Sequence, residues 1–317
     1  MTDTVRGETV GVVGVGYMGG AVTRSLLRAG FEVYVYDIRE DAVRQLVAAG
    51  ACAAPSIEAL VAKCKVVSIV VVSDDQVRDV GARIVAAAAP GTVILIHSTV
   101  RPSTAVALAD LARPRQLSVL DVAVNGGNEK ADLGRLTLMI GGDEAAVRYC
   151  RPFFEAIGEH IFHIGPLGSG LVGKLVNNLI AIGSYALQLE AMRFAAAYGI
   201  DEDTVTTIVS ASQGDNRGIR TWGRHDRKRR ARKAQGVEWY ERMGRDLEEA
   251  AIAAGARGVP LPLTAVIAEA LPQKLRERDR ELDRRQPAAP IPLCRGCDQE
   301  LAAPFRVAGI HPECRQD

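Results

Sequence analysis

The chain has 317 residues, of which 48% are hydrophobic and 24% charged, and its formal net charge is +1 at pH 7. These values are typical of a globular protein with two domains, and the balanced charge provides no overall attraction to nucleic acid or membranes. No apolar run approaches the roughly 20 residues that span a bilayer, and the polar first nine residues do not resemble a signal peptide. We therefore expect a cytoplasmic protein without membrane segments.

The first half of the chain alternates between predicted strands and helices. Helical periodicity at 18–29, 42–49 and 75–89 predicts helices between the early strands. This alternation predicts an α/β fold, a Rossmann-type doubly wound parallel sheet at about 1–167. The buried strands are predicted from short apolar runs at 9–15, 31–37, 66–72, 93–97, 117–124 and 136–140.

The pattern changes at Gly168, after which almost no strand signal remains. An all-α domain is expected at 168–285, with a long helix at 169–198 that would measure about 45 Å if unbroken. Such a helix is long enough to form part of a subunit interface, so we expect a homodimer. Shorter helices are predicted at 237–254 and 263–271, and a proline-rich linker with a separate tail at 286–317.

A glycine pattern at the end of the first predicted strand indicates a nucleotide site. Gly14, Gly16 and Gly19 form G-x-G-x-x-G at the start of a helix, where a pyrophosphate can bind. Asp37 ends the next strand and is placed to bond a ribose 2′-hydroxyl and repel a 2′-phosphate. Arg39 complicates this preference, since a nearby arginine can accept a 2′-phosphate. The pattern favours NAD and leaves NADP possible; the alternative role of Asp37 is a helix N-cap.

Lys174 and Asn178 lie four residues apart in the long helix and therefore share one face. A neutral lysine can take a hydroxyl proton while hydride leaves the carbinol carbon, and apolar neighbours such as Leu171 and Leu175 favour the neutral form. Asn178 would orient the hydroxyl. Taken alone, the pair is more typical of a solvated lysine on an amphipathic helix.

Motifs that follow one another across about residues 8–270 resemble those of the β-hydroxyacid dehydrogenase family. This family includes 3-hydroxyisobutyrate dehydrogenase, tartronate semialdehyde reductase and 6-phosphogluconate dehydrogenase. The similar segments are the cofactor loop at 14–19, a Ser-Thr-x-x-Pro segment at 98–102, a glycine loop for substrate at 121–127, a catalytic helix at 168–178 with Lys174 at the catalytic lysine, and a Lys-Asp-Leu-like segment at 244–247.

The resemblance implies reversible oxidation of a small anionic 3-hydroxy acid to its semialdehyde or keto acid. Lys174 would be the general base in oxidation and the general acid in reduction, with Asn178 beside it. Ser98 and the backbone at Asn125, Gly126 and Gly127 would hold the substrate carboxylate. The implied contacts with the nicotinamide cofactor are Gly14, Gly16, Tyr17, Met18, Gly19, Asp37, Arg39, Val72, Ser73, Thr99 and Arg245.

Three departures from the family pattern leave the substrate open. His97 replaces a usual acidic residue, Asn125 a usual serine, and Arg245 a usual lysine. Two other functions remain as alternatives. Imine reductases share the architecture but usually lack the lysine, and a non-catalytic cofactor-binding regulator would use the tail to bind a partner.

Two further segments stand outside these motifs. Residues 224–233 hold seven basic residues in ten, typical of a solvated surface, an anion site for a large acidic substrate or, least favoured, a nucleic-acid contact. In the tail, Cys294, Cys297, His311 and Cys314 form C-x2-C-x13-H-x2-C. This spacing suits a tetrahedral structural zinc and resembles a small LIM or treble-clef finger; the alternative is a disordered tail with incidental thiols.

Overall fold

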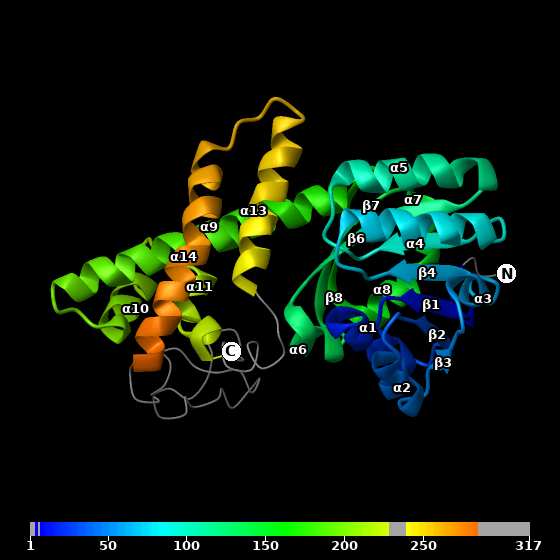
Figure 1. Ribbon diagram of the computed structural model, residues 1–317, viewed down its shortest axis with the longest axis horizontal. Helices are drawn as coiled ribbons and strands as arrows, with labels where there is room; N and C mark the ends of the chain where they lie inside the picture. Colours follow the sequence, from blue (N-terminus) through cyan, green and yellow to red (C-terminus); the bar gives the residue numbers. More distant parts are fainter. Residues whose placement is uncertain (1–3, 6, 228–238, 285–317) are drawn as a thin grey trace. The chain divides into compact units, whose positions relative to one another are not determined.

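The computed structural model describes residues 4–5, 7–227 and 239–284 (Figure 1). The chain divides into two compact units, Met1–Val176 and Asn177–Asp317. The division falls inside one continuous helix, α9 (Ser169–Ala197). Most of the first unit therefore precedes α9, and the second unit contains the rest of that helix and the described helices after it.

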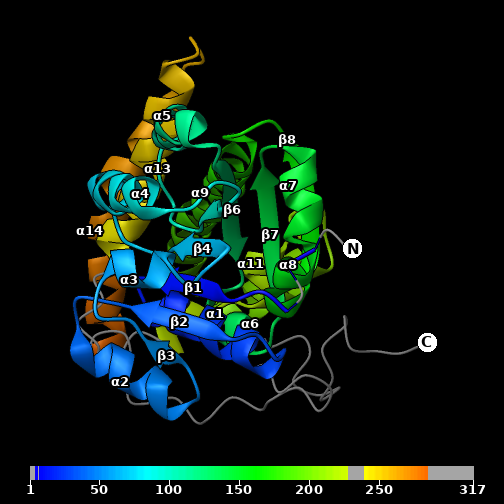
Figure 2. The ribbon, with the colours of Figure 1, turned by 90° about the vertical axis from the view of Figure 1, so that its right-hand side faces the viewer.

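An eight-stranded sheet forms the centre of the first unit (Figure 2). The first six strands run parallel, which confirms the doubly wound arrangement predicted from the apolar runs. β7 pairs antiparallel with β6, and β8 pairs parallel with β7, so the far edge of the sheet runs in the opposite direction. The order is β3-β2-β1-β4-β5-β6-β7-β8, with β1 Val10–Val13, β2 Val33–Tyr36, β3 Cys52–Ala53, β4 Val66–Ile69, β5 Val93–Ile96, β6 Ser118–Asn125, β7 Leu136–Gly141 and β8 Gly158–Gly165.

Helices cover both faces of this sheet, which is why β1, β4 and β5 are buried along their whole length. One face packs in a cluster that includes Val12, Leu26 and Phe153, and the other in a cluster that includes Ile69 and Ile84. The first cluster draws on α1 (Tyr17–Arg28), α2 (Glu40–Ala48), α6 (Gly127–Asp132), α7 (Glu144–Tyr149) and α8 (Arg151–Ile157), and the second on α3 (Ile57–Val61), α4 (Asp74–Ala87) and α5 (Pro102–Ala112).

The strand order reverses at β1, which lies between β2 and β4. The chain passes from β1 to β2 and β3 on one side, and from β4 onward on the other. In open α/β sheets, ligands bind at the carboxyl ends of the strands that flank such a reversal. Residues that follow β1 and β4 therefore have the position expected of a ligand site.

In the second unit, every regular element that the structure describes is a helix, as the sequence predicted. Beyond α9 these are α10 (Glu202–Ser210), α11 (Arg217–Arg220), α13 (Trp239–Gly255) and α14 (Pro262–Arg284). Ile182 and Leu189 of α9 pack with Trp222, Leu247 and Leu271 in one apolar core.

The predicted end of the last helix at residue 271 is wrong, because α14 continues through Pro272 to Arg284. A proline inside a helix removes a backbone hydrogen bond and costs about 3 kcal/mol. Packing on both sides offsets that cost: Leu271 and Leu275 are buried in the core, and Arg278 forms buried ion pairs. Tertiary contacts thus override the local stop signal.

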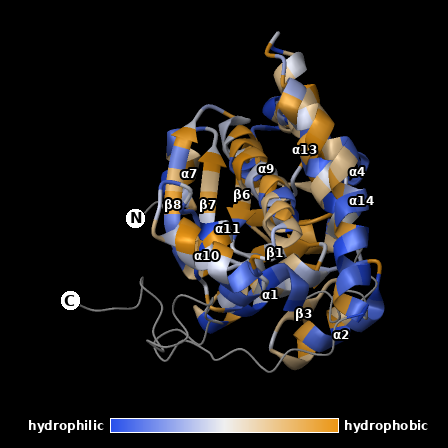
Figure 3. Ribbon diagram, turned by 90° about the vertical axis from the view of Figure 1, so that its left-hand side faces the viewer, coloured by the Kyte–Doolittle hydropathy of each residue, from blue (hydrophilic) through white to orange (hydrophobic). Residues whose placement is uncertain are grey.

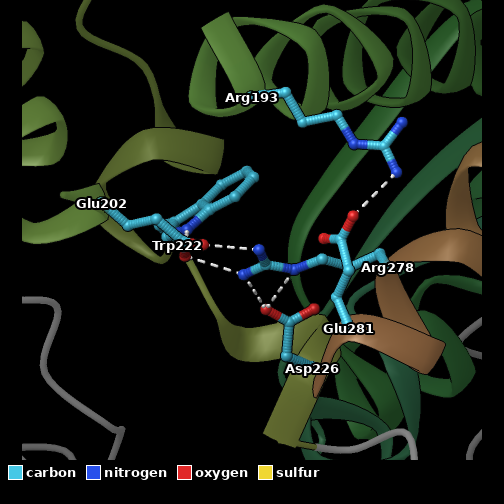
Figure 4. A network of polar contacts seen from close by, with 6 residues as sticks. All are labelled: Arg193, Glu202, Trp222, Asp226, Arg278 and Glu281. Carbon is cyan, nitrogen blue, oxygen red and sulfur yellow. Dashed lines mark hydrogen bonds and ion pairs between the residues drawn. The ribbon is translucent and has the colours of Figure 1, made fainter. Parts of the chain in front are cut away.

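The ion pairs of Arg278 tie α14 to the segment that contains α10 and α11 (Figure 4). Its guanidinium donates to Glu202 at 2.7 Å and to Asp226 at 2.8 Å, and it lies 5.6 Å from the centroid of the Trp222 ring. The indole N–H of Trp222 donates to Glu202 at 2.6 Å. Burial alone would lower the pKa of Arg278, but the hydrogen bonds with Glu202 and Asp226 raise it.

In the part of the chain that the structure describes, α9 alone is long and apolar enough to cross a membrane by length and composition. An 18-residue window has a mean hydropathy of 1.2. The expectation that no apolar run approaches a spanning length is therefore wrong on composition. Of that window 39% is buried, and Leu175, Tyr185 and Met192 are among the enclosed side chains of the helix. Figure 3 shows hydrophobic residues along α9.

Candidate active site

Two glycines after β1 allow backbone segments to come unusually close together. A Cβ at Gly14, where φ is +87°, would lie 2.4 Å from the carbonyl oxygen of Val70, and one at Gly19 would lie 2.0 Å from the carbonyl oxygen of Gly14. Gly16 precedes the first residue of α1 and has no side chain to cap it. The first N–H groups and positive end of α1 therefore form a cradle that fits a dinucleotide pyrophosphate.

Asp37, beyond the end of β2, holds this glycine loop. Its carboxylate accepts the backbone N–H of Val15 at 2.7 Å and that of Arg39 at 2.9 Å, and only 10% of the side chain is exposed. The Arg39 guanidinium lies 3.7 Å from the Asp37 carboxylate. A Cβ at Gly16 would lie 3.4 Å from the same guanidinium. The acidic and basic residues that bear on cofactor choice thus lie together beside the cradle.

The other residues assigned to the cofactor follow the carboxyl ends of neighbouring strands. Tyr17 and Val72 are 62% and 68% exposed, and Thr99 is also exposed. Met18 packs partly against the core, and Ser73 caps α4 by accepting the Gln76 N–H at 3.3 Å. The structure therefore brings these residues to one edge of the sheet, while their contacts with a cofactor stay predictions.

Ser98 has a structural role in addition to any role toward substrate. The side chain is buried, and its hydroxyl oxygen accepts the N–H of Val71 at 2.9 Å. It thereby joins the end of β5 to the end of β4. The prediction that Ser98 holds a substrate carboxylate stays a prediction.

The glycine loop assigned to the substrate follows β6. Gly126 and Gly127 have φ values of +138° and +72°, which side chains rarely tolerate. The loop turns directly into α6, and the carbonyl oxygen of Ala131 accepts the hydroxyl of Ser25 on α1 at 2.6 Å. Asn125 ends β6 and is partly exposed. The loop thus has a backbone conformation that requires glycine, and it is fixed at its far end.

Asp121, which the sequence motif did not single out for this role, anchors the start of α9. It is fully buried in β6, and its two carboxylate oxygens accept the N–H groups of Gly168 at 2.6 Å and Leu171 at 2.7 Å. A Cβ at Gly170 would lie 2.8 Å from this carboxylate. Burial raises the pKa of Asp121, although the backbone hydrogen bonds oppose this effect. The only sequence signal was one carboxylate within an apolar strand.

Lys174 follows this anchored turn. Its side chain is half-buried, and the neighbouring Leu171 and Leu175 are enclosed in the core. Because α9 is continuous from Ser169 to Ala197, Lys174 and Asn178 lie on one helix face, as predicted.

Asn178 belongs to the second unit, where an unpredicted partner contacts it. Its side chain is 8% exposed, and its Nδ2 donates to the carboxylate of Asp246 on α13 at 2.9 Å. Arg245, the neighbour assigned to the cofactor, is exposed on the same helix. The Arg245-Asp246 pair therefore combines an exposed cation with a carboxylate that points to a candidate site residue. No sequence signal paired Asp246 with Asn178.

His97 directly follows β5 and is buried; in the family that the sequence resembles, this position usually holds an acidic residue. Its Nδ1 contacts the carbonyl oxygen of Val122 at 3.0 Å, and its Nε2 contacts the Ser68 hydroxyl at 3.3 Å. A carbonyl only accepts, so Nδ1 carries the proton and Nε2 accepts from Ser68. The ring stacks on Phe153 at 6.0 Å. Burial lowers the pKa of His97 to about 4, so the ring is neutral at pH 7.

The predicted zinc ligands Cys294, Cys297, His311 and Cys314 lie outside the described residues. Within residues 4–5, 7–227 and 239–284, no group of three or more His, Cys, Asp or Glu side chains could hold a metal. Part of the basic run 224–233 also lies outside them. Its described beginning is tied to the fold, since Asp226 pairs with Arg278.

Comparison with known proteins gives this arrangement a family. Residues 9–165 match the NAD binding domain of 6-phosphogluconate dehydrogenase, and residues 168–291 match the domain described as NAD-binding of NADP-dependent 3-hydroxyisobutyrate dehydrogenase. An NAD-dependent L-serine dehydrogenase of Pseudomonas aeruginosa is 38% identical over 214 residues, 66% of this chain and 71% of that protein. The chain belongs to the β-hydroxyacid dehydrogenase family. It is an NAD(P)-dependent enzyme of the 3-hydroxyacid dehydrogenase type.

Other relatives and solved structures agree with this membership. An L-threonate dehydrogenase of Cupriavidus necator is 34% identical over 66% of this chain and 72% of its own length. A 3-hydroxyisobutyrate dehydrogenase of Salmonella typhimurium has a TM-score of 0.71 at 27% identity, covering 95% of this chain and 99% of that one. A 3-hydroxyisobutyrate dehydrogenase of Mycobacterium tuberculosis, solved with L-serine, has a TM-score of 0.75, with 95% of this chain and 98% of that one covered; at 23% identity it shows the fold alone.

Proposed function

We propose that this family member oxidises a small 3-hydroxy acid reversibly to its semialdehyde or keto acid, with NAD as the preferred cofactor and Lys174 as the general acid/base. The observation that carries the proposal is the anchoring of α9. Asp121, on the strand that leads into the glycine loop, fixes the turn that precedes Lys174. One strand thus positions both the acid/base group and the loop expected to hold the substrate carboxylate.

Bound NAD would supply the hydride acceptor, held by Gly14, Gly16 and Gly19 at the start of α1. Lys174, when neutral, takes the proton of the substrate hydroxyl at Nζ during oxidation and returns it during reduction. Asn178, on the same helix face, orients that hydroxyl. Backbone N–H groups at Asn125–Gly127 hold the carboxylate, since successive N–H groups in a glycine-rich turn suit an anion.

The proposal is tested by offering small hydroxy acids with NAD and NADP and following absorbance of the reduced nicotinamide. L-serine, L-threonate, 3-hydroxyisobutyrate and 2-(hydroxymethyl)glutarate are the first substrates to offer, because relatives that act on them are 31–38% identical. If the protein oxidises neither these compounds nor any other 3-hydroxy acid in a wider screen, the proposal is overturned. Reduction of cyclic imines instead would favour the imine reductase alternative.

Lys174→Ala should lower turnover by a factor on the order of 10² to 10⁴, the usual contribution of a positioned acid/base. Lys174→Arg should not restore it, because a guanidinium stays protonated. NAD affinity should stay close to wild type in both variants, since the glycine cradle is untouched. Lys63→Ala, an exposed lysine of the first unit, is the matched control. Full activity in Lys174→Arg would refute the assignment.

The preference for NAD depends on Asp37. Asp37→Asn keeps an oxygen for the Val15 N–H, gives up the exposed contact with the Arg39 N–H and removes the negative charge, so use of NADP should rise while the Val15 contact still holds the loop. Asp37→Ala loses both and should weaken NAD binding as well. If the wild-type protein already uses NADP better than NAD, Arg39 determines the choice and the assignment of Asp37 is wrong.

The proposed homodimer interface is an exposed apolar stripe on α9. Ile180, Leu187, Phe194 and Tyr198 are 66–74% exposed and recur at spacings of seven and four residues. Such a stripe suits packing against a second copy, and the rings of Phe194 and Tyr198 already pair at 5.3 Å. Light scattering that finds only monomer at micromolar concentration would contradict this interface.

The tail motif supports a structural zinc on spacing alone. Metal analysis of the purified full chain should find about one zinc per chain, lost in Cys294→Ser. A metal-free protein with unchanged stability would refute it.

A further inference from the structure

Asp246 contacts a residue of the proposed site through one directed hydrogen bond. The Nδ2 group of Asn178 donates to Asp246 Oδ2 at 2.9 Å, and Asn178 is 8% exposed. A carboxylate only accepts, so the amide must present its nitrogen to Asp246. The amide oxygen then faces the other way, where it accepts the Nδ2 of Asn177 at 3.2 Å. The orientation of the Asn178 amide is therefore fixed by chemistry.

Asp246 lies on a part of α13 that packs closely against the rest of the second unit. Its neighbour Leu247 is 1% exposed in the core of the second unit. A Cβ at Gly244 would lie 3.5 Å from Pro272 and 3.6 Å from the carbonyl oxygen of Ala268, so α13 packs closely on α14 at this point. A carboxylate mounted on this packed pair of helices can hold an amide in one rotamer.

We infer that Asp246 is a positioning residue for the reaction: it keeps the amide of Asn178 in one orientation on the α9 face that Asn178 shares with Lys174. This inference rests on the proposed function. The resemblance to the family assigned this segment to the cofactor through residue 245, whereas the hydrogen bond gives the next residue a role toward the substrate hydroxyl.

The decisive pair of variants is Asp246→Leu and Asp246→Asn. Leucine removes the acceptor and should lower kcat on the order of 10- to 100-fold, the effect of losing one positioned hydrogen bond at a buried amide, with a smaller change in NAD affinity. Asparagine has an amide oxygen that accepts the same N–H and should return kcat to within a few-fold of wild type. If Asp246→Asn is as poor as Asp246→Leu, charge rather than orientation is needed, and the inference is wrong.

A double-mutant cycle tests whether Asp246 acts through Asn178. Asp246→Leu should have no further effect on kcat in an Asn178→Ala background. Additive losses would overturn the inference, because they would show that the two residues act independently. Glu241→Gln, which breaks the exposed 2.8 Å ion pair between α13 and Arg276 of α14, is the matched control and should leave kcat and the cycle unchanged.

A spectroscopic readout makes the test independent of turnover. In protein labelled with ¹⁵N-asparagine, the side-chain amide signal that disappears in Asn178→Ala should shift in Asp246→Leu and stay in place in Glu241→Gln. An unshifted signal refutes the hydrogen bond. Failure of the wild type to turn over any hydroxy acid overturns the proposed function and the inference with it. An active wild type with a fully active Asp246→Leu overturns the inference alone.

Discussion

Lowering the pH below 6.5 should destabilise the first unit through His97. The ring is 3% exposed, and burial lowers its pKa from 6.5 to about 4. In the folded protein the ring therefore stays neutral at pH values where the unfolded chain already binds a proton. Above pH 6.5 neither state is protonated and His97 contributes no pH dependence. As the pH falls from 6.5 towards 4, proton binding stabilises the unfolded state relative to the folded state, and the free energy of unfolding decreases.

The magnitude follows from the two pKa values. Each pKa unit corresponds to about 1.36 kcal/mol, so the full difference between the two pKa values would cost about 3 kcal/mol. At pH 5 the cost is about 2 kcal/mol, and at pH 4 about 3 kcal/mol. Against a total stability on the order of 5–15 kcal/mol, this is a large fraction for one side chain.

The assay is urea unfolding at pH 7.5, 6 and 5, followed by far-ultraviolet circular dichroism and by hydrogen exchange of the β5 peptide. Both tryptophans lie at positions 222 and 239, so their fluorescence would follow the second unit instead. His97→Gln should lower stability at pH 7.5 but flatten the pH dependence by about 2 kcal/mol between pH 7.5 and 5. The comparison also removes the contribution of Asp121, whose raised pKa acts in the opposite direction.

His160→Gln removes an exposed imidazole on β8 and is the control, expected to keep the wild-type pH dependence. Equal pH dependence in wild type and His97→Gln would refute the reasoning. It would mean that the folded protein accommodates a charged ring at this position.

Three further changes have defined expected outcomes. Gly19→Ala should weaken NAD binding by at least about tenfold by calorimetry, because a Cβ cannot stand 2.0 Å from the carbonyl oxygen of Gly14 without moving the phosphate cradle. Arg278→Met should cost about 3 kcal/mol in urea unfolding followed by tryptophan fluorescence, since its two carboxylate partners lose their cation in a largely buried position. Asp121→Asn should cost about 1–3 kcal/mol by circular dichroism, because the new amide nitrogen would face a backbone N–H.

The strands that are short buried apolar runs could be predicted from the sequence. The antiparallel direction of β7 near the edge of the sheet could not. β1, β4 and β5 are fully buried apolar runs, so composition alone locates them. β7 is antiparallel because the connection from β6 holds only the six-residue α6, too short for the crossover that a parallel pair needs. β8 was missed because its residues are mostly exposed and include polar side chains. An edge strand is held by backbone pairing, which leaves little trace in side-chain pattern.

Among the candidate site residues, the glycines have a local sequence signal, whereas the carboxylates depend on partners far away in the sequence. A glycine's role has a local signal, since the positive φ of Gly14 and the close approach of Gly19 to the carbonyl oxygen of Gly14 both arise within the motif, although Gly14 also lies against Val70 of a distant segment. The role of Asp121 depends on N–H groups 47 and 50 residues away, and that of Asp246 on an amide 68 residues away. Sequence spacing carries no information about such partners, so both were unassigned even where the motif containing them was recognised.

In each of the two units, candidate residues are held by carboxylates that bond to the chain itself. Asp37 accepts an N–H of the cofactor loop, Asp121 two N–H groups of the α9 turn, and Asp246 the amide of Asn178. A carboxylate suits this task because it is acceptor-only and its charge-assisted bonds to N–H groups are stronger than neutral ones. Because each of these carboxylates already accepts N–H groups of the chain, it has fewer lone pairs left to bind a ligand. Under the proposed function, Asp37 would bind ribose with the lone pairs that remain beside its loop contacts. Asparagine keeps the oxygen that accepts the Val15 N–H and alanine does not, so comparing the two variants distinguishes the effect of the charge on cofactor choice from the effect of losing that contact.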